Sequence, residues 1–248
     1  MHSNSSTRRP KVIVFASGTK DGGGSGFENL VVASRSGILN ADIVAVVSNH
    51  ERGGVRERAD RLGVPFIYLN LARHTNILEN VGMLYQEVVR KSGAEWVALS
   101  GWMKQVKGLD PKHTFNIHPA LLSQLGGPSP RHSGLRPREG GRFGGKGMYG
   151  TSLYEAVKVA FDTGEITATG VSMHFVTDEY DRGPVFFEYR VPLRKGMSAE
   201  EIAKAVNVAE HKWQPKITNM VVHGEISWDG KDPKSLVVPA GYQYLPKP

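Results

Sequence analysis

Short β-branched runs alternate with helical patterns along most of this chain, and this alternation constrains the fold more than any other feature. Five runs have the length and composition of buried strands, at residues 11–17, 41–49, 65–70, 95–101 and 114–120. Helical patterns separate the first four, at 27–37, at 55–63 and in a segment ending near Lys91. Strands that alternate with helices form right-handed βαβ units. The sequence therefore predicts an α/β fold with a doubly wound, mostly parallel sheet and a Rossmann-like N-terminal half.

The second half of the chain continues with two helices and two strands. The helices are expected at 151–164 and from Ser198 onward, where Glu201 stands at the capping-box position. The strands are expected at 171–177 and 184–193.

The chain shows no internal repeat and no linker that would force two domains. We expect a disordered tail over 1–10, one domain over 11–225 and an extended C-terminal tail over 226–248.

The composition excludes several classes of site and protein. The chain has 248 residues and no cysteine, which rules out disulfides, thiolate zinc sites and a cysteine nucleophile. No stretch approaches the roughly 20 apolar residues that span a bilayer, and the N-terminus lacks the apolar core of a signal peptide. We therefore expect a cytoplasmic protein without membrane contact. The sequence leaves open whether it forms a homodimer.

The chain is basic, with a formal net charge of +7. Such a surface could attract nucleic acid or an anionic small substrate, or it could be an ordinary solvated surface. The segment 126–147 is rich in Gly, Pro and Arg, but it carries no aromatic-and-basic RNA-binding signature. We expect small-molecule substrates and regard nucleic acid as unlikely.

Ligands of open α/β sheets bind beyond the carboxyl ends of the strands. That rule selects four loops, which also contain the residues most capable of chemistry: Ser17–Gly26, Gly101–Lys104, Asn116–Pro119 and Thr177–Gly183. This agreement predicts an enzyme.

The first of these loops is rich in glycine. It places GGGSG, residues 22–26, directly before a helix, where backbone N–H groups could bind a phosphate. The loop matches neither the dinucleotide fingerprint nor the P-loop. A flexible surface turn explains the glycines equally well.

Asn116 and His118 face the same side of a predicted strand end. An amide donor and an imidazole there can stabilise an oxyanion and move a proton, although a lone histidine more often belongs to the core. Asp181 follows His174 near another strand end, where it could orient His118 or simply serve a turn. No Ser or Cys nucleophile is placed by a recognisable elbow. These residues suit direct acyl transfer to an amine.

The motifs SGWMK, FNIHPALL and HFVTDEYDRGPV, in this order, closely resemble the phosphoribosylglycinamide formyltransferases, a branch of the folate-dependent formyltransferase superfamily. The resemblance covers roughly 11–225. It implies transfer of formyl from the co-substrate 10-formyltetrahydrofolate to the amine of 5'-phosphoribosylglycinamide in purine biosynthesis, through a tetrahedral intermediate and without a metal.

The resemblance also implies a role for individual residues. The catalytic residues would be Asn116, His118 and Asp181, and Glu210 would hold the ribose and glycinamide part of the acceptor. The phosphate would be bound by Gly24, Ser25 and Gly26. The folate pocket would be lined by Met103, Lys104 and Val106.

Some residues depart from the family pattern. Gly26 stands where Asn is usual, the loop before it is longer, and Tyr154 stands where His is common. Two alternatives therefore stay open. One is formyl transfer to another amine acceptor, such as methionyl-tRNA or an amino-sugar nucleotide. The other is a non-catalytic nucleotide- or RNA-binding relative. The tRNA enzymes carry an additional C-terminal barrel, for which the residues after the last helix leave no room.

Overall fold

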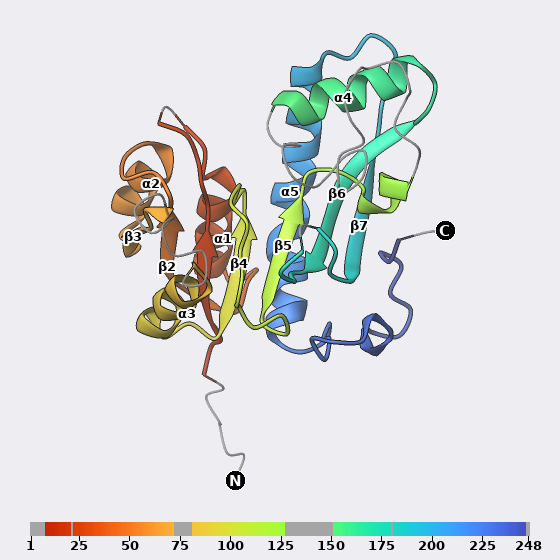
Figure 1. Ribbon diagram of the computed structural model, residues 1–248. Helices are drawn as coiled ribbons and strands as arrows, with labels where there is room; N and C mark the ends of the chain where they lie inside the picture. Colours follow the sequence, from red (N-terminus) through yellow and green to blue (C-terminus); the bar gives the residue numbers. More distant parts are fainter. Residues whose placement is uncertain (1–7, 21, 72–80, 127–150, 180, 247–248) are drawn as a thin grey trace.

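The computed structural model describes residues 8–20, 22–71, 81–126, 151–179 and 181–246. These residues form a seven-stranded sheet in the order β3-β2-β1-β4-β5-β6-β7, flanked by helices (Figure 1). The strands are β1 (Lys11–Phe15), β2 (Asp42–Ser48), β3 (Phe66–Tyr68), β4 (Trp96–Ser100), β5 (Thr114–His118), β6 (Ala168–Phe175) and β7 (Val185–Pro192). The helices are α1 (Ser25–Ser36), α2 (Gly54–Leu62), α3 (Val81–Ser92), α4 (Thr151–Asp162) and α5 (Ala199–Val222).

The first five strands run parallel to one another, which confirms the predicted fold class. The last two do not follow them, because β6 pairs antiparallel with β5, and β7 pairs antiparallel with β6. The carboxyl end of β6 therefore lies at the opposite end of the strands from the carboxyl ends of β1, β4 and β5. We expected Thr177–Gly183 to follow a strand whose carboxyl end lies with those of β1, β4 and β5, and this expectation is wrong.

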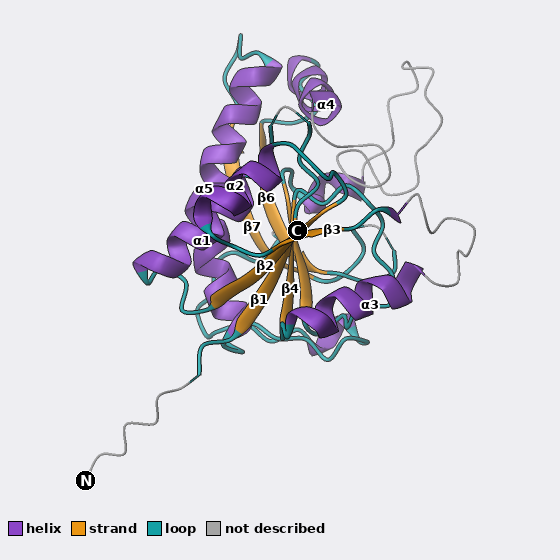
Figure 2. Ribbon diagram, turned by 90° about the vertical axis from the view of Figure 1, so that its left-hand side faces the viewer, coloured by secondary structure: helices purple, strands orange, loops and turns teal. Residues whose placement is uncertain are grey.

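The two faces of the sheet have separate cores because alternate side chains of a strand point to opposite sides. Val12 and Val14 of β1 belong to the larger core, whereas Ile13 and Phe15 belong to the smaller one. Helices α1, α2, α4 and α5 contribute to the larger core, and α3 contributes to the smaller one. Figure 2 shows α1, α2 and α5 on one side of the strands and α3 on the other.

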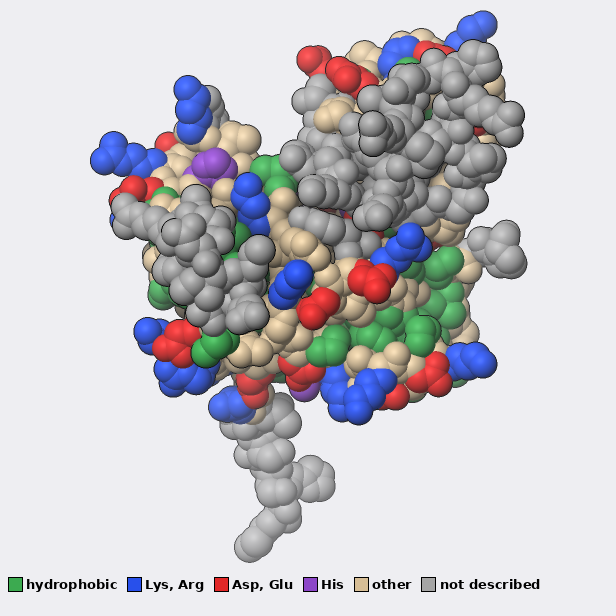
Figure 3. Space-filling view, in the orientation of Figure 1, with side chains coloured by type: hydrophobic (Ala, Val, Ile, Leu, Met, Phe, Trp, Pro, Cys, Tyr) green, Lys and Arg blue, Asp and Glu red, His purple; other side chains and the backbone are tan. Residues whose placement is uncertain are grey.

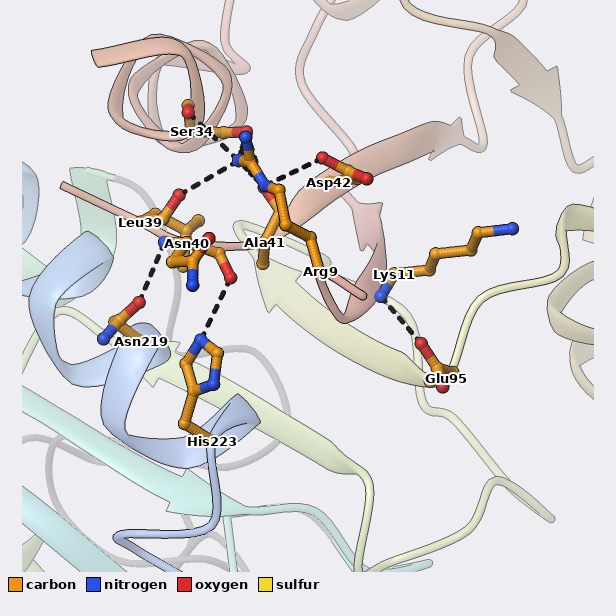
Figure 4. A network of polar contacts seen from close by, with 10 residues as sticks. All are labelled: Arg9, Lys11, Ser34, Leu39, Asn40, Ala41, Asp42, Glu95, Asn219 and His223. Carbon is orange, nitrogen blue, oxygen red and sulfur yellow. Dashed lines mark hydrogen bonds and ion pairs between the residues drawn. The ribbon is translucent and has the colours of Figure 1, made fainter. Parts of the chain in front are cut away.

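Helix α5 begins with the predicted capping box, in which Ser198 accepts from the Glu201 amide and Glu201 accepts from the Ser198 amide. It contains Pro215. Beyond the proline, the Asn219 side chain accepts from the Asn40 amide, and His223 contacts the Asn40 carbonyl (Figure 4). These contacts attach the second half of α5 to the turn between α1 and β2.

The N-terminal segment enters beside this turn. Arg9 donates to three backbone carbonyls between Ser34 and Ala41 and pairs with Asp42 (Figure 4). Residues 1–7 of the predicted tail lie outside the described residues, so its extent stays a prediction.

Residues 226–246 contain one short 3₁₀ helix and otherwise run without regular structure. They cross to the outer edge of β7, where the Glu188 amide donates to the Tyr244 carbonyl at 2.6 Å. Tyr242 and Tyr244 pack edge to face, and Tyr244 also packs on Phe187 and Trp213. This segment covers what would otherwise be an open sheet edge.

One face of the molecule shows acidic and basic side chains interspersed (Figure 3). Hydrophobic side chains gather at the lower right of this view, where Figure 1 places the C-terminal segment. The basic segment 126–147 lies, apart from Gly126, outside the described residues. Within the part of the chain that the structure describes, no helix is both long and apolar enough to cross a bilayer.

Candidate active site

The glycine-rich loop connects β1 to α1, as its sequence predicts. Its last residue, Gly24, has a left-handed backbone (φ 82°), and no side chain caps the helix that follows. The first N–H groups of an α-helix have no partner within the helix. Those at Ser25 and Gly26 therefore have no partner within α1.

The loop rests on the beginning of α2. A Cβ atom on Gly54 would lie 2.4 Å from the Gly22 carbonyl carbon, and one on Gly53 would lie 2.3 Å from the Thr19 oxygen. Side chains at either position would push the loop away. This loop, which is longer than the family pattern has, is thus supported by close backbone packing against α2.

Gly26 lies under two side chains from other elements. A Cβ atom here would lie 2.2 Å from Ser100 Oγ and 3.2 Å from Gln214 Oε1. Gln214 comes from α5 and is 1% exposed. Ser100 ends β4, and its hydroxyl donates to Gln214 at 3.5 Å. Ser100 of β4 and Gln214 of α5 therefore occupy the space that a side chain at position 26 would fill.

Asn116 and His118 lie on one face of β5, as their spacing predicts. His118 is 7% exposed. Between them, Ile117 points into the larger core on the opposite face. The core holds the strand in register and thereby sets the direction of both polar side chains.

Asp181 reaches this face although its loop follows the antiparallel strand β6. The loop folds tightly: a Cβ atom on Gly183 would lie 1.8 Å from the Phe175 carbonyl oxygen. Asp181 itself has φ 52°, a left-handed conformation that Asp and Asn adopt more readily than most residues. Its carboxylate lies 4.0 Å from His118 Nδ1 and 3.4 Å from His174 Nε2.

His174 is the residue whose part our sequence reasoning missed. It is 2% exposed, and its Nδ1 lies 2.7 Å from the Phe175 carbonyl, which can only accept a hydrogen bond. That contact puts a hydrogen on Nδ1 and leaves Nε2 facing Asn116 Nδ2 at 3.1 Å. The Asn116 and His174 positions are directly opposite across the antiparallel strands. Recognising β6 as antiparallel would have revealed this pair.

Hydrogen bonds from β6 and β7 hold the chain just beyond His118. The Ser172 hydroxyl accepts from the Leu122 amide and donates to the Ala120 carbonyl. The Glu188 carboxylate accepts from both the amide and the hydroxyl of Ser123. These bonds fix where β5 ends.

The segment predicted to line the folate pocket covers the same face of the sheet. Ser17 Oγ accepts from the Met103 amide at 2.9 Å, which ties this segment to the glycine-rich loop. The Asp178 carboxylate accepts from the Gly108 amide at 3.0 Å, which ties it to the loop that carries Asp181. Val106 is buried and Lys104 is exposed.

A recess of about 350 Å³ of empty space, open to solvent, lies between these segments. Its lining combines the predicted folate segment with the catalytic candidates: Leu99, Trp102, Lys104, Gln105, Val106, Asn116, His174, Val176, Thr177, Glu179 and Asp181. Met103 and His118 do not line it.

Glu210 lies on α5, facing Tyr154 of α4. Burial raises the pKa of the Glu210 carboxyl to about 7, against the effect of a hydrogen bond from Asn207. Burial, and then the Glu210 charge, raises the pKa of the Tyr154 phenol. A carboxyl with this pKa gains or loses its proton near neutral pH.

Within the described residues, no group of three or more His, Asp or Glu side chains is arranged to hold a metal ion. The polar side chains of the site contact one another and the backbone instead.

Residues 10–218 match the family model described as formyl transferase. The chain belongs to this family. It is 31% identical over 225 residues to the chloroplastic phosphoribosylglycinamide formyltransferase of Arabidopsis thaliana, covering 89% of this chain and 68% of the relative. It is 26% identical to phosphoribosylglycinamide formyltransferase of Escherichia coli, covering 87% of this chain and 88% of the relative.

The chain spans 64% of a second plant relative and about a fifth of the cattle trifunctional purine biosynthetic protein. Among solved structures, glycinamide ribonucleotide transformylase 1 from Symbiobacterium toebii superposes with a TM-score of 0.69 at 23% identity, over 93% of this chain and 94% of that one. That likeness supports the formyl transferase fold.

In this formyl transferase, the structure brings Asn116 and Asp181 together at the recess, with His118 beside Asp181. Gly24, Ser25 and Gly26 lie at the N-terminus of α1. Glu210 stands apart from the recess, on the side of the sheet that α5 covers. The predicted site residues therefore lie in three places: a cluster around Asp181, the N-terminus of α1, and a separate carboxylate on α5.

Proposed function

We propose that this chain transfers the formyl group of 10-formyltetrahydrofolate to the amine of 5'-phosphoribosylglycinamide, a step of purine biosynthesis. One observation carries the proposal: Asp181 lies within 4.0 Å of His118 and within 3.4 Å of His174, beside Asn116. The names of the relatives, which match most of this chain, support the same acceptor and reaction.

The proposed chemistry needs one bond formed and one broken. The acceptor amine attacks the formyl carbon, and the carbonyl oxygen becomes an oxyanion. Asn116 and protonated His118 stabilise this oxyanion. The bond from carbon to N10 of the folate then breaks, and the proton lost by the amine goes to N10. Asp181, with water, moves that proton and holds His118 in place.

His174 extends this proposal. Because its Nδ1–H is held by the Phe175 carbonyl, its Nε2 is oriented toward Asn116 and Asp181. An acceptor nitrogen there orients the Asn116 amide so that its second N–H can face the oxyanion. We therefore assign His174 a positioning role rather than a place at the reacting atoms.

The two substrates would approach from different sides. The folate would occupy the recess at Lys104 and Val106. The acceptor phosphate would bind at Gly24–Gly26, where α1 has no capping side chain. Glu210 would accept hydrogen bonds from the ribose and glycinamide part. The amine would then meet the formyl carbon near His118.

The decisive experiment offers three acceptors to the purified protein with 10-formyltetrahydrofolate. We expect formylation of 5'-phosphoribosylglycinamide, and none of methionyl-tRNA or an amino-sugar nucleotide. Transfer to either of the other acceptors, without transfer to the ribonucleotide, would refute the proposed acceptor. Binding without transfer to any acceptor would instead indicate a non-catalytic relative.

The lack of cysteine suits a reducing cytoplasm, which we propose as the location.

A further inference from the structure

Pro215 leaves a gap in the hydrogen bonding of α5. In an α-helix, the amide of residue 215 would donate to the carbonyl of His211, four residues earlier. Proline has no N–H, and its ring pushes that carbonyl away from the helix axis. The His211 carbonyl therefore needs another donor, and it lies one residue after Glu210.

The donor comes from a different helix. Asn29 of α1 donates from its side-chain amide to the His211 carbonyl at 2.9 Å. Asn29 lies four residues, about one turn, after Ser25. The bond thus connects the helix that would hold the acceptor phosphate to the helix that carries Glu210.

A second contact joins the same two helices on the same side of the proline. Gln214, which is almost fully buried, packs against Gly26 and accepts from Ser100. By contrast, Asn219 and His223 attach the part of α5 beyond Pro215 to Asn40, away from the site (Figure 4). Helix α5 therefore has separate anchors before and after its proline.

We propose that Asn29 is a positioning residue for the acceptor. By bonding the carbonyl that Pro215 leaves without its helical donor, it sets the distance between Glu210 and the N-terminus of α1. This inference rests on the proposed function, which places the two ends of one ribonucleotide at these two elements. Asn29 need not touch either substrate.

The first test substitutes Asn29 alone. Asn29→Ala removes the donor, and Asn29→Asp keeps the shape but turns an oxygen toward the carbonyl. We expect both to raise the KM for 5'-phosphoribosylglycinamide about tenfold, as for one lost hydrogen bond to a partly buried carbonyl. The KM for 10-formyltetrahydrofolate should stay within about twofold, because its recess lies on the opposite face of the sheet.

The second test combines Asn29→Ala with Pro215→Ala. Alanine at 215 restores the amide that can bond the His211 carbonyl, so Asn29 should matter less. We expect Asn29→Ala to change the acceptor KM less than about threefold in this background. Equal effects of Asn29→Ala in both backgrounds would overturn the proposal.

Asn219→Ala is the matched control, since it removes an asparagine contact of α5 beyond the proline. It should lower the Tm without changing the acceptor KM.

Hydrogen–deuterium exchange supplies a readout independent of turnover. Asn29→Ala should speed exchange in 205–214, and Asn219→Ala should speed it after 215. Unchanged exchange in 205–214 would refute the role of Asn29. A wild-type protein that does not formylate the ribonucleotide would refute the proposed function, and the exchange data would still decide whether Asn29 anchors α5.

Discussion

At the scale of single residues, the site is built around one carboxylate that lies beside two imidazoles. Asp181 faces His118 Nδ1 through one oxygen and His174 Nε2 through the other. His174 also contacts Asn116, so the four side chains form one connected group. A change at one member should alter the orientation or protonation of the others.

We expect His118→Ala and Asp181→Asn each to lower kcat by a large factor, with the double variant little worse than the poorer single variant. Asparagine is the informative choice at 181, because it also tolerates the left-handed backbone and so removes the charge without refolding the loop. Single-turnover rates with both substrates saturating measure the effect. Losses that simply multiply would argue against a coupled pair.

Glu210 gives a prediction about pH and stability. Its pKa is about 7 in the folded protein and near 4.5 when unfolded. Between these values the folded protein holds a proton that the unfolded chain has lost, so stability falls as pH rises through this window. Above it, the charged carboxylate stays partly buried at a constant cost.

Glu210→Gln should therefore match the wild type in free energy of unfolding below about pH 4.5 and exceed it above about pH 7. Urea unfolding at a series of pH values measures the difference. The same variant should bind the ribonucleotide more weakly. A constant stability difference across the series would show that burial of this carboxyl carries no such cost.

At the scale of elements, the uncapped beginning of α1 is the feature most open to test. Ser25→Asp would put a carboxylate where the phosphate is proposed to bind, whereas Ser25→Ala would remove one hydroxyl, on the order of 1 kcal/mol. We expect Ser25→Asp to weaken 5'-phosphoribosylglycinamide severely and Ser25→Ala mildly. Isothermal titration of each substrate measures this. Folate binding is the internal control and should hardly change, and equal ribonucleotide affinity in Ser25→Asp would exclude this phosphate site.

Elements with strong local signals were predictable from the sequence. The capping box at Ser198, the glycine that ends α2 and the β-branched runs of the parallel strands all act within a few residues. The direction of β6 was not predictable in this way, because a buried strand has the same composition in either direction. The pairing of His174 with Asn116 depends on that direction. Asn29 was hidden for a related reason, since its partner is a backbone carbonyl 182 residues away.

At the scale of the whole molecule, the C-terminal segment completes the sheet. It covers the edge of β7 and packs Tyr244 against Trp213 and Phe187, with Tyr242 against Tyr244. Exposed edges promote association between chains. The segment should therefore contribute to both stability and solubility.

Removing residues 239–248 should lower the free energy of unfolding by about 2–4 kcal/mol, the scale expected for two partly buried aromatic side chains. It should also cause concentration-dependent association, which light scattering would detect.

Tyr242→Phe is the control. Among the described residues none bonds the buried Tyr242 hydroxyl, so its loss should leave stability unchanged or improved. A truncated chain with the same association state and the same stability as the full chain would contradict the role of this segment.

The left-handed backbone of Asp181 has a consequence for how variation at this position is read. Only Gly, Asn and Asp adopt such a conformation readily, so the turn restricts the choice of residue before any chemistry does. Few residue types would therefore be accepted at position 181, even in a related protein that had lost its activity. An aspartate retained there is thus a weaker sign of a working enzyme than a retained histidine at 118, where an ordinary strand admits many replacements.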